Sequence, residues 1–240
     1  MGDAADKMDL IASERTRIEA EYQRRERELA PDLYAPWQPA EMLSGSSRKR
    51  IAAALLHRNG VFPRVGDKCL EIGVGNLGWL GDLISWGVHE RDIYGIELQT
   101  SRVEHVHEIL PCCDVRTGDA SALPWPDNSF HLVIASTVIS SILEQKIRRQ
   151  VAAEITRVIQ PGGALLWYDF AYNNPRNPSV RRIYRSELKE LFPDLHGPIR
   201  RITLAPPIAR FVVPKSWPLA VLLETVPFLR THLLAVLRKN

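Results

Sequence analysis

Cysteine is scarce in this sequence, since the 240 residues include only Cys69, Cys112 and Cys113. Three cysteines at this spacing form neither a disulfide framework nor a metal-ligand motif. The sequence therefore excludes a disulfide-stapled extracellular domain and favours a reducing compartment. We expect a cytoplasmic protein in which all three thiols are small buried apolar groups.

Long apolar runs are absent as well. No stretch reaches 18 uncharged apolar residues, so the sequence predicts no membrane-spanning helix. The first residues are charged and lack the apolar stretch of a secretory signal, so we expect no such signal. The most apolar segment, residues 217–240, is interrupted by Glu224, Pro227, Arg230 and His232.

An excess of one charge is also missing. Lysine and arginine total 31 against 28 acidic residues, and the formal net charge is +3. This small excess, with scattered arginines and no RNA-binding aromatic motif, argues against a nucleic-acid partner. The content of 45% hydrophobic and 25% charged residues is that of an ordinary globular protein. The length suits one large α/β domain with extensions.

Strand-like and helix-like segments alternate from residue 68 to residue 170. Five apolar segments predict strands at residues 68–73, 92–98, 113–119, 130–136 and 164–170. Helical patterns at residues 78–86, 101–110 and 144–160 separate them. Strands separated by helices predict a doubly wound, Rossmann-like parallel sheet that is buried on both faces. Two further strands are predicted at residues 199–205 and 231–238.

The N-terminal segment has a different pattern. Residues 1–30 are rich in charge and carry a narrow apolar helical stripe of Met8, Ile11, Ile18, Tyr22 and Leu29. Such a helix suits a lid or a dimer contact rather than a core position. A second helix is predicted near residues 47–60. We therefore divide the chain into a helical extension, residues 1–60, and a nucleotide-binding domain, residues 61–240.

The stretch EIGVGNLG, residues 71–78, follows the first predicted strand. Its glycines, Gly73, Gly75 and Gly78, match the Gly-x-Gly-x-x-Gly pattern of nucleotide-binding turns. In an open parallel sheet the ligand binds at the carboxyl ends of the strands, where this turn is expected. The pattern alone does not distinguish NAD from S-adenosylmethionine.

Three carboxylates favour S-adenosylmethionine. Glu97 ends the second predicted strand and can accept hydrogen bonds from ribose hydroxyls of either cofactor. Glu71 precedes the glycines and would repel the pyrophosphate that an NAD site places at a helix N-terminus, but it would attract a sulfonium. Asp119 follows the third strand, where it can accept a hydrogen bond from an adenine amino group.

These motifs, with GDASALPWPDNSF at residues 118–130 and EITRVIQPGG at residues 154–163, resemble the class I S-adenosylmethionine-dependent methyltransferases of the small-molecule type 11 group. The resemblance implies a seven-stranded sheet in the order 3-2-1-4-5-7-6 with an antiparallel last strand. That strand would be residues 231–239, which makes the apolar C-terminal segment part of the core. Two residues depart from the family pattern. Leu77 stands where a glycine is usual, and His131, which we expect to be structural, replaces an aspartate.

The residue pattern and the resemblance together define a candidate site. The predicted cofactor-binding residues are Glu71, Gly73, Gly75, Asn76, Gly78, Glu97, Leu98, Asp119, Ala120 and Ser136, with Tyr34 and Trp37 as aromatic shields of the sulfonium. Predicted substrate contacts are Tyr168, Tyr172, Asn173, Asn174 and Arg176. Asp169 is the best candidate base or substrate anchor; the alternative is that it caps a turn or pairs with an arginine. No metal is expected, because the segment ASTVISS after the fourth strand lacks a carboxylate or a histidine.

The predicted activity is transfer of a methyl group from S-adenosylmethionine to a small molecule, leaving S-adenosylhomocysteine. The acceptor would be an oxygen of a sugar, a glycan precursor or a specialised metabolite. Arginines between residues 176 and 201 would suit an anionic acceptor, or they are solvated surface residues. The alternatives are an N- or C-methyltransferase and a non-catalytic cofactor-binding partner subunit. A homodimer through the N-terminal helix is a further option.

Overall fold

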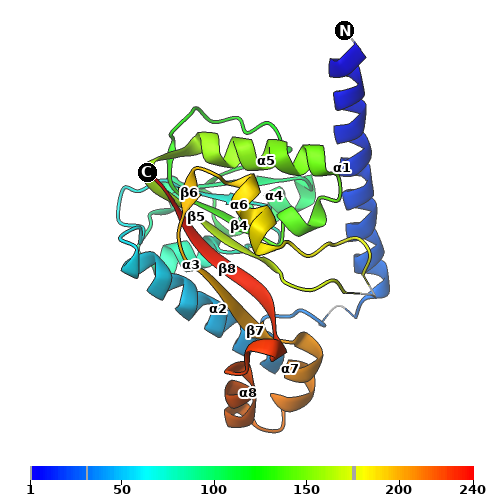
Figure 1. The fold of residues 1–240 in the computed structure, drawn as a ribbon, viewed down its shortest axis with the longest axis vertical. Helices are drawn as coiled ribbons and strands as arrows, with labels where there is room; N and C mark the ends of the chain where they lie inside the picture. The colour runs from blue at the N-terminus through cyan, green and yellow to red at the C-terminus, as the bar shows by residue number, and fades with distance from the viewer. Residues whose placement is uncertain (1, 31, 175–176) are drawn as a thin grey trace.

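The computed structural model describes residues 2–30, 32–174 and 177–240. One sheet crosses the molecule and helices cover both of its faces (Figure 1). The helices are α1 Gly2–Glu28, α2 Pro39–Arg58, α3 Leu80–Ser85, α4 Thr100–Ile109, α5 Gln145–Val158, α6 Arg185–Leu191, α7 Pro206–Val212 and α8 Trp217–Glu224, with short 3₁₀ turns η1 Glu90–Asp92, η2 Ile139–Ser141 and η3 Pro227–Leu229. The strands are β1 Cys69–Ile72, β2 Ile93–Glu97, β3 Asp114–Thr117, β4 Phe130–Ser136, β5 Ile159–Phe170, β6 Leu195–His196, β7 Ile199–Leu204 and β8 Arg230–Lys239.

The sheet has the predicted topology. Strands β3, β2, β1, β4 and β5 are parallel neighbours in that order. β8 lies antiparallel beside β5 and carries β6 and β7 along its other edge. The predicted class, strand order and antiparallel last strand are confirmed.

The predicted sixth strand is interrupted, so β6 and β7 together take its place. Gly197 separates them, and a Cβ on this residue would lie 1.9 Å from the carbonyl oxygen of Val236 in β8. The two chains approach each other too closely here for any side chain, which explains the glycine.

Alternate residues of the central strands enter two separate cores. Val133 and Trp167 pack on the face that α5 and α6 cover. Leu132 and Leu166 pack on the opposite face, beneath α2, α3 and α4. Residues 233–237 of β8 are buried between these layers, so the end of the apolar C-terminal segment is a core strand, as predicted.

Helix α2 begins earlier than its sequence pattern indicated. Pro39 occupies its first turn, where the fixed φ of proline suits a helix and the missing N–H costs no hydrogen bond. Leu55 and Leu56 of α2 are buried against the sheet, so this helix contributes to the core.

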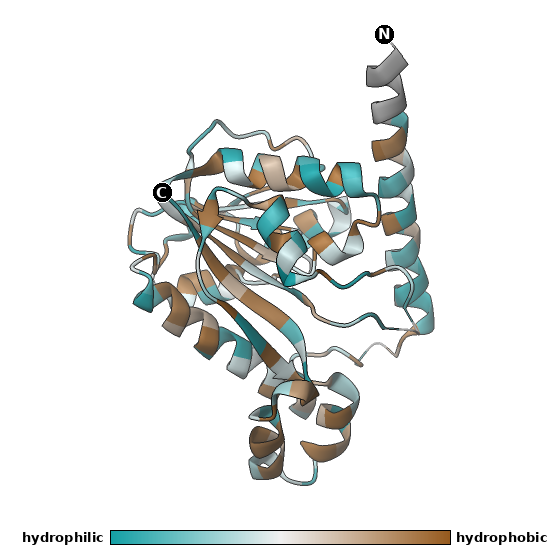
Figure 2. Ribbon diagram, in the orientation of Figure 1, coloured by the Kyte–Doolittle hydropathy of each residue, from teal (hydrophilic) through white to brown (hydrophobic). Residues whose placement is uncertain are grey.

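Two parts of the chain project from the body of the molecule. The first turns of α1 extend past one end, and a hairpin of α7 and α8 protrudes at the other (Figure 1). The hairpin is rich in apolar residues (Figure 2), and the sequence pattern did not predict it. In the described parts of the chain, no helix has the length and apolar character needed to cross a membrane.

Candidate functional site

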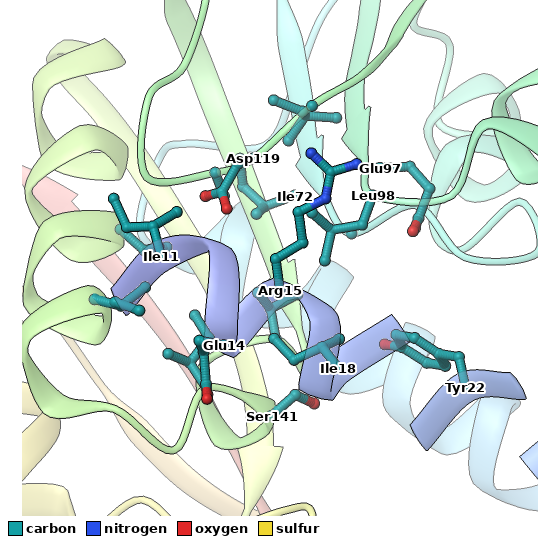
Figure 3. Close-up of a pocket in the computed structure, with 18 residues that line it drawn as sticks. Ile11, Glu14, Arg15, Ile18, Tyr22, Ile72, Glu97, Leu98, Asp119 and Ser141 are labelled. Atoms are coloured by element: carbon teal, nitrogen blue, oxygen red, sulfur yellow. The ribbon is translucent and has the colours of Figure 1, made fainter. Parts of the chain in front are cut away.

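A pocket lies at the carboxyl ends of β1 to β4 and beneath α1 (Figure 3). It holds about 640 Å³ of space, counted to its open mouth. Its lining residues are Ile11, Glu14, Arg15, Ile18, Tyr22, Ile72, Gly73, Ile96, Glu97, Leu98, Gly118, Asp119, Ala120, Val138, Ser141, Ile142, Ile147 and Val151. The structure therefore brings Gly73, Glu97, Leu98, Asp119 and Ala120 together, as the sequence analysis anticipated.

Glu97 is fixed by the backbone around it. One carboxylate oxygen accepts a hydrogen bond from the Gly75 N–H at 2.8 Å, and the other accepts one from the Gln99 N–H at 3.2 Å. The first of these bonds connects the end of β2 to the glycine turn after β1. Glu97 is therefore held rigidly at the pocket wall, where its remaining lone pairs can accept hydrogen bonds from a ligand.

The glycine turn depends on left-handed backbone conformations. Gly73, Gly75 and Gly78 have φ values of 70°, 57° and 39°, which glycine adopts without a steric cost. A Cβ on Gly73 would lie 2.8 Å from the Val138 side chain, so this glycine also keeps the pocket open. Leu77 has φ of 68°. It keeps the backbone shape of the glycine that is usual there, despite its side chain.

Glu71 lies behind this turn rather than in the pocket. Both of its carboxylate oxygens accept the Trp79 N–H, at 3.0 and 2.8 Å, and the side chain is buried. A Cβ on Gly78 would come within 2.2 Å of the carboxylate. Burial raises the pKa of Glu71 well above its usual range, although the Trp79 hydrogen bond and nearby Arg48 oppose that shift. Glu71 thus shapes the turn from within.

Asp119 and Ala120 form the wall beyond β3. One oxygen of Asp119 accepts the Ser121 N–H at 2.6 Å, which turns the chain sharply after the strand. The side chain faces the pocket from the side opposite Glu97 (Figure 3). The two carboxylates therefore face one space from the ends of adjacent strands.

Helix α1 closes the pocket and is fixed by Glu14. This carboxylate accepts the Leu143 N–H at 2.5 Å and pairs with Arg17 at 2.9 Å, while Arg17 also donates to the Ser141 carbonyl. Burial by itself would raise the pKa of Glu14, but these hydrogen bonds lower it overall. They attach the helix to the segment between β4 and α5.

The pocket-facing side of α1 is the apolar stripe seen in the sequence. Ile11, Ile18 and Tyr22 line the pocket, and Arg15 extends from the same helix towards the side that carries Glu97 and Asp119 (Figure 3). The Arg15 Nε also donates to Glu19 at 2.8 Å. The stripe was recognised in the sequence, but its position facing the pocket was not. The side chain of Met8 lies outside the described part of the structure.

Besides Glu71, Gly75 and Gly78, which lie in or behind the glycine turn, four further predicted cofactor contacts do not line the pocket. Tyr34 and Trp37 are 62% and 61% exposed and do not line the pocket. Asn76 is exposed on the glycine turn, and Ser136 ends β4 outside the lining set. Among the described residues, Tyr22 is instead the aromatic residue that lines the pocket.

Asp169 lies outside the pocket and is fully buried, with 0% exposure. Its two oxygens accept the N–H groups of Ser140 and Phe170, each at 2.9 Å. Burial raises the pKa of Asp169 to about 6, against the effect of these bonds. The geometry corresponds to the turn-capping alternative, because the carboxylate holds η2 against the end of β5.

The predicted substrate contacts are divided between core and surface. The buried Tyr168 hydroxyl lies 2.9 Å from Thr203 Oγ1. The Tyr172 hydroxyl accepts Arg201 at 2.8 Å, and Asn173 accepts the Arg182 N–H at 2.9 Å. These bonds order the chain after β5.

Two further predicted contacts add little to this picture. The backbone carbonyl of the exposed Asn174 accepts the Asn177 N–H, and Arg176 lies outside the described residues.

His131 is at the start of β4, away from the pocket. Its Nε2 lies 3.3 Å from the Val61 carbonyl oxygen and 3.7 Å from an Asp67 carboxylate oxygen. These contacts fit the structural role expected for His131.

The residues of the pocket fit a cationic adenosine cofactor. Three carboxylates, Glu14, Glu97 and Asp119, line it against one described cation, Arg15. Isoleucine and valine side chains form much of the remaining wall and suit an adenine ring. The absence of a Cβ at Gly73 leaves space that a ligand could occupy. An adenosine sulfonium would therefore find hydrogen-bond acceptors and favourable charge here.

Comparison with known proteins agrees with this geometry. A model of the methyltransferase domain family matches residues 69–163. A probable S-adenosylmethionine-dependent methyltransferase from Mycolicibacterium smegmatis is 31% identical over 144 residues, which cover 55% of this chain and 54% of that protein. A demethylmenaquinone methyltransferase from Renibacterium salmoninarum is 36% identical over 153 residues, which cover 64% of this chain and 60% of that protein. The matched region thus spans only about half to three-fifths of these relatives.

The fold has close counterparts among solved structures. The PH0226 protein from Pyrococcus horikoshii OT3 superposes with a TM-score of 0.63 at 15% identity, covering 92% of this chain and 99% of that one. This likeness concerns the fold, whereas the family match rests on the sequence of residues 69–163. Residues 69–163, which hold the glycine turn and the strand-end carboxylates Glu97 and Asp119, are therefore similar to the methyltransferase domain family.

Proposed function

We propose that this protein transfers a methyl group from S-adenosylmethionine to a small-molecule acceptor. The observation that carries the proposal is the pair of carboxylates, Glu97 and Asp119, that face one pocket from the ends of β2 and β3. In this proposal Glu97 accepts the ribose hydroxyls and Asp119 accepts the adenine amino group. When bound, the cofactor supplies an electrophilic methyl group.

The chain's own residues would then position the reactants and exclude water. Helix α1, fixed by Glu14, forms the lid of this proposal, and Ile11 and Ile18 give it an apolar inner face. A closed apolar cover favours methyl transfer, because it keeps water from competing with the acceptor. Residues 1–60 thus act as the extension that completes the site, although α2 also packs on the core.

Asp169 has a positioning role in this mechanism. Both of its oxygens are occupied by backbone N–H groups, so it holds η2, which contains the pocket residue Ser141 and is followed by the pocket residue Ile142. A nucleophilic acceptor needs little help from a base, because the donor methyl group is already activated. Alignment of the acceptor is then the main contribution of the protein.

The acceptor we favour is an oxygen of a sugar, a glycan precursor or a specialised metabolite. The polar side chains of Tyr172 and Asn173, which accept hydrogen bonds from Arg201 and Arg182, support a hydroxyl-rich ligand near the end of β5. Methylation of carbon on a quinone ring is the second candidate, which the similarity to the Renibacterium salmoninarum demethylmenaquinone methyltransferase supports.

Calorimetric titration with S-adenosylhomocysteine tests the cofactor assignment. Glu97→Ala should weaken binding roughly 10- to 100-fold, the effect of losing charge-assisted hydrogen bonds. Glu108→Ala is the matched control, because Glu108 is an exposed acid on α4, and it should bind as the unmodified protein does. Tight NAD binding without S-adenosylhomocysteine binding would overturn the assignment.

An acceptor screen with isotopically labelled S-adenosylmethionine tests methyl transfer itself. Sugars, glycan precursors and demethylated quinones should be offered in parallel, with mass spectrometry to locate the added methyl group. Label on oxygen supports the favoured acceptor, and label on a ring carbon supports the second candidate. Cofactor binding without transfer to any acceptor would instead support a non-catalytic partner subunit.

A further inference from the structure

The α7–α8 hairpin presents an apolar surface to solvent. Six large apolar side chains between residues 206 and 229 are exposed, and Phe228 and Leu222 reach 74% and 63%. They lie on the part that protrudes from the end of the molecule (Figures 1 and 2). We name this set the hairpin tip; its members are Phe211, Trp217, Leu219, Val221, Leu222 and Phe228.

The hairpin is held firmly on the domain by other residues. Ala209, Val213 and Ala220 pack with Leu43 of α2 and Leu204 of β7 in a separate small core. This packing leaves the hairpin tip facing outwards, so its apolar residues are not required for the internal core. An exposed apolar cluster on a fixed support is the usual sign of an interaction surface.

Hydrogen bonds from Arg230 hold the base of the hairpin in place. Its guanidinium donates to the carbonyls of Glu224, Thr225 and Arg201. These bonds join the end of α8 to β7 and β8. The hairpin therefore behaves as one body with the sheet rather than as a loose loop.

The hairpin's own unburied charges are basic, although Arg210 pairs with Glu41 of α2 at 3.7 Å. Residues 206–230 contain Arg210, Lys215 and Arg230, whereas the one acid in this stretch, Glu224, is buried and accepts Ser47 at 2.9 Å. A groove beside the hairpin is lined by Arg50, Arg58, Arg200, Arg201 and Arg230. A second hollow, shared by Val221, Thr225, Arg50 and Arg230, connects this arginine groove to α8.

We propose that the hairpin tip and the arginine groove together dock the protein on an anionic lipid bilayer. Apolar side chains with tryptophan at the interface and flanking cations are the features of interfacial membrane binding. The tip would enter the headgroup and upper acyl region, while the arginines contact anionic headgroups. Helices of seven and eight residues are far too short to span the membrane.

A second copy of the chain fits this surface less well. A twofold dimer places the same patch on both subunits, so the arginine grooves would approach each other and repel. An anionic bilayer instead offers opposite charge to the arginines and an apolar phase to the tip. Docking does not depend on the proposed methyl transfer, and the test below measures binding alone.

Vesicle co-sedimentation tests the proposal. The full chain should bind vesicles of phosphatidylcholine with 30% phosphatidylglycerol better than pure phosphatidylcholine. Leu222→Ser and Phe228→Ser should each lower the partition coefficient by roughly tenfold, the loss expected from one buried large apolar side chain. The matched control is Val65→Ser, since Val65 is 70% exposed on the loop before β1, and it should bind normally.

The electrostatic part has its own variants. Arg58→Gln and Arg200→Gln should each weaken binding to the anionic vesicles by roughly fivefold, corresponding to about 1 kcal/mol per cation. They should leave the weaker binding to phosphatidylcholine unchanged. The four substituted residues are exposed, so we expect unchanged melting temperatures, which would show that the variants remain folded; they are Arg58, Arg200, Leu222 and Phe228.

Three results would overturn the proposal. These are absence of binding to both vesicle types, binding that Leu222→Ser and Phe228→Ser leave unchanged, and a dimer in sedimentation velocity that these two variants dissociate. The last result would assign the hairpin tip to a second copy. Calorimetric binding of S-adenosylhomocysteine should stay normal in every variant, which separates this outcome from failure of the proposed function.

Discussion

The Glu71 carboxylate accepts the backbone N–H of Trp79 with both oxygens, at 3.0 and 2.8 Å. This bond closes the glycine turn around a buried acid. The acid therefore acts on the cofactor site through the backbone that it shapes, and its substitution should first affect the stability of the turn.

Glu71→Ala should lower the free energy of unfolding by about 1–3 kcal/mol, because it leaves the buried Trp79 N–H without an acceptor. Glu71→Gln keeps an acceptor and removes the buried charge. The pKa of Glu71 is raised in the folded protein, so its favourable contribution is greatest below pH 4.5 and is lost as pH rises. In urea unfolding, the free energy of unfolding of Glu71→Gln relative to that of the unmodified protein should therefore rise from pH 5 to pH 8. Equal damage from both substitutions would contradict this account.

Leu77 carries a left-handed backbone with φ of 68°, which costs a non-glycine residue about 1 kcal/mol. Leu77→Gly and Leu77→Ala both remove the isopropyl group beyond Cβ, but only glycine also removes the Cβ that causes the strain. Leu77→Gly should be about 1 kcal/mol more stable than Leu77→Ala in urea unfolding. If the two variants have the same free energy of unfolding, the turn does not hold this conformation in solution.

Arg15 is the described cation that lines the pocket with Glu97 and Asp119. A cation there repels the sulfonium of S-adenosylmethionine but not the neutral thioether of S-adenosylhomocysteine. Arg15→Ala should raise the affinity for the first relative to the second roughly two- to fivefold, an effect on the order of 1 kcal/mol or less for a solvent-screened pair. Arg15→Lys keeps the charge and should leave the ratio of the two dissociation constants unchanged. Calorimetry with both ligands measures the ratio, and an unchanged ratio in Arg15→Ala would place the guanidinium outside the site.

The raised pKa of Asp169 should make the free energy of unfolding depend on pH. Its pKa is raised to about 6 in the folded protein from 3.8, so its contribution is present below about pH 4 and is lost as pH rises through 6. The difference in unfolding free energy between the unmodified protein and Asp169→Asn should fall by on the order of 3 kcal/mol from pH 4 to pH 7. This subtraction cancels other titrating groups, including His232. A constant difference across that range would mean that Asp169 ionises normally.

The parts of the site that could be predicted from sequence are those tied to strand ends. Glu97 and Asp119 follow apolar strands, and parallel topology brings such positions to one edge whatever the helices do. The C-terminal strand was predictable for a related reason, since its continuous apolar run suits a strand buried on both faces.

The remaining contacts depend on packing that spacing does not encode. The apolar stripe of α1 was visible, but whether Tyr22 or Tyr34 lines the pocket depends on where Glu14 and Arg17 attach that helix. Glu71 follows the expected motif and yet turns inwards, because Gly78 leaves room for its carboxylate. The α7–α8 hairpin was missed because prolines divide it into helices too short to show a clear period.

The position of β8 has a consequence for folding. Within the described residues β6 and β7 pair only with β8, which also covers the outer edge of β5. A nascent chain that ends before residue 230 would therefore expose an unpaired β5 edge and hold two strands without a partner. The sheet is completed last between β5 and the strands β6 and β7, and the contacts of β8 with β5 are distant in sequence, so they form slowly. Until then the growing chain carries an open edge that is prone to aggregation.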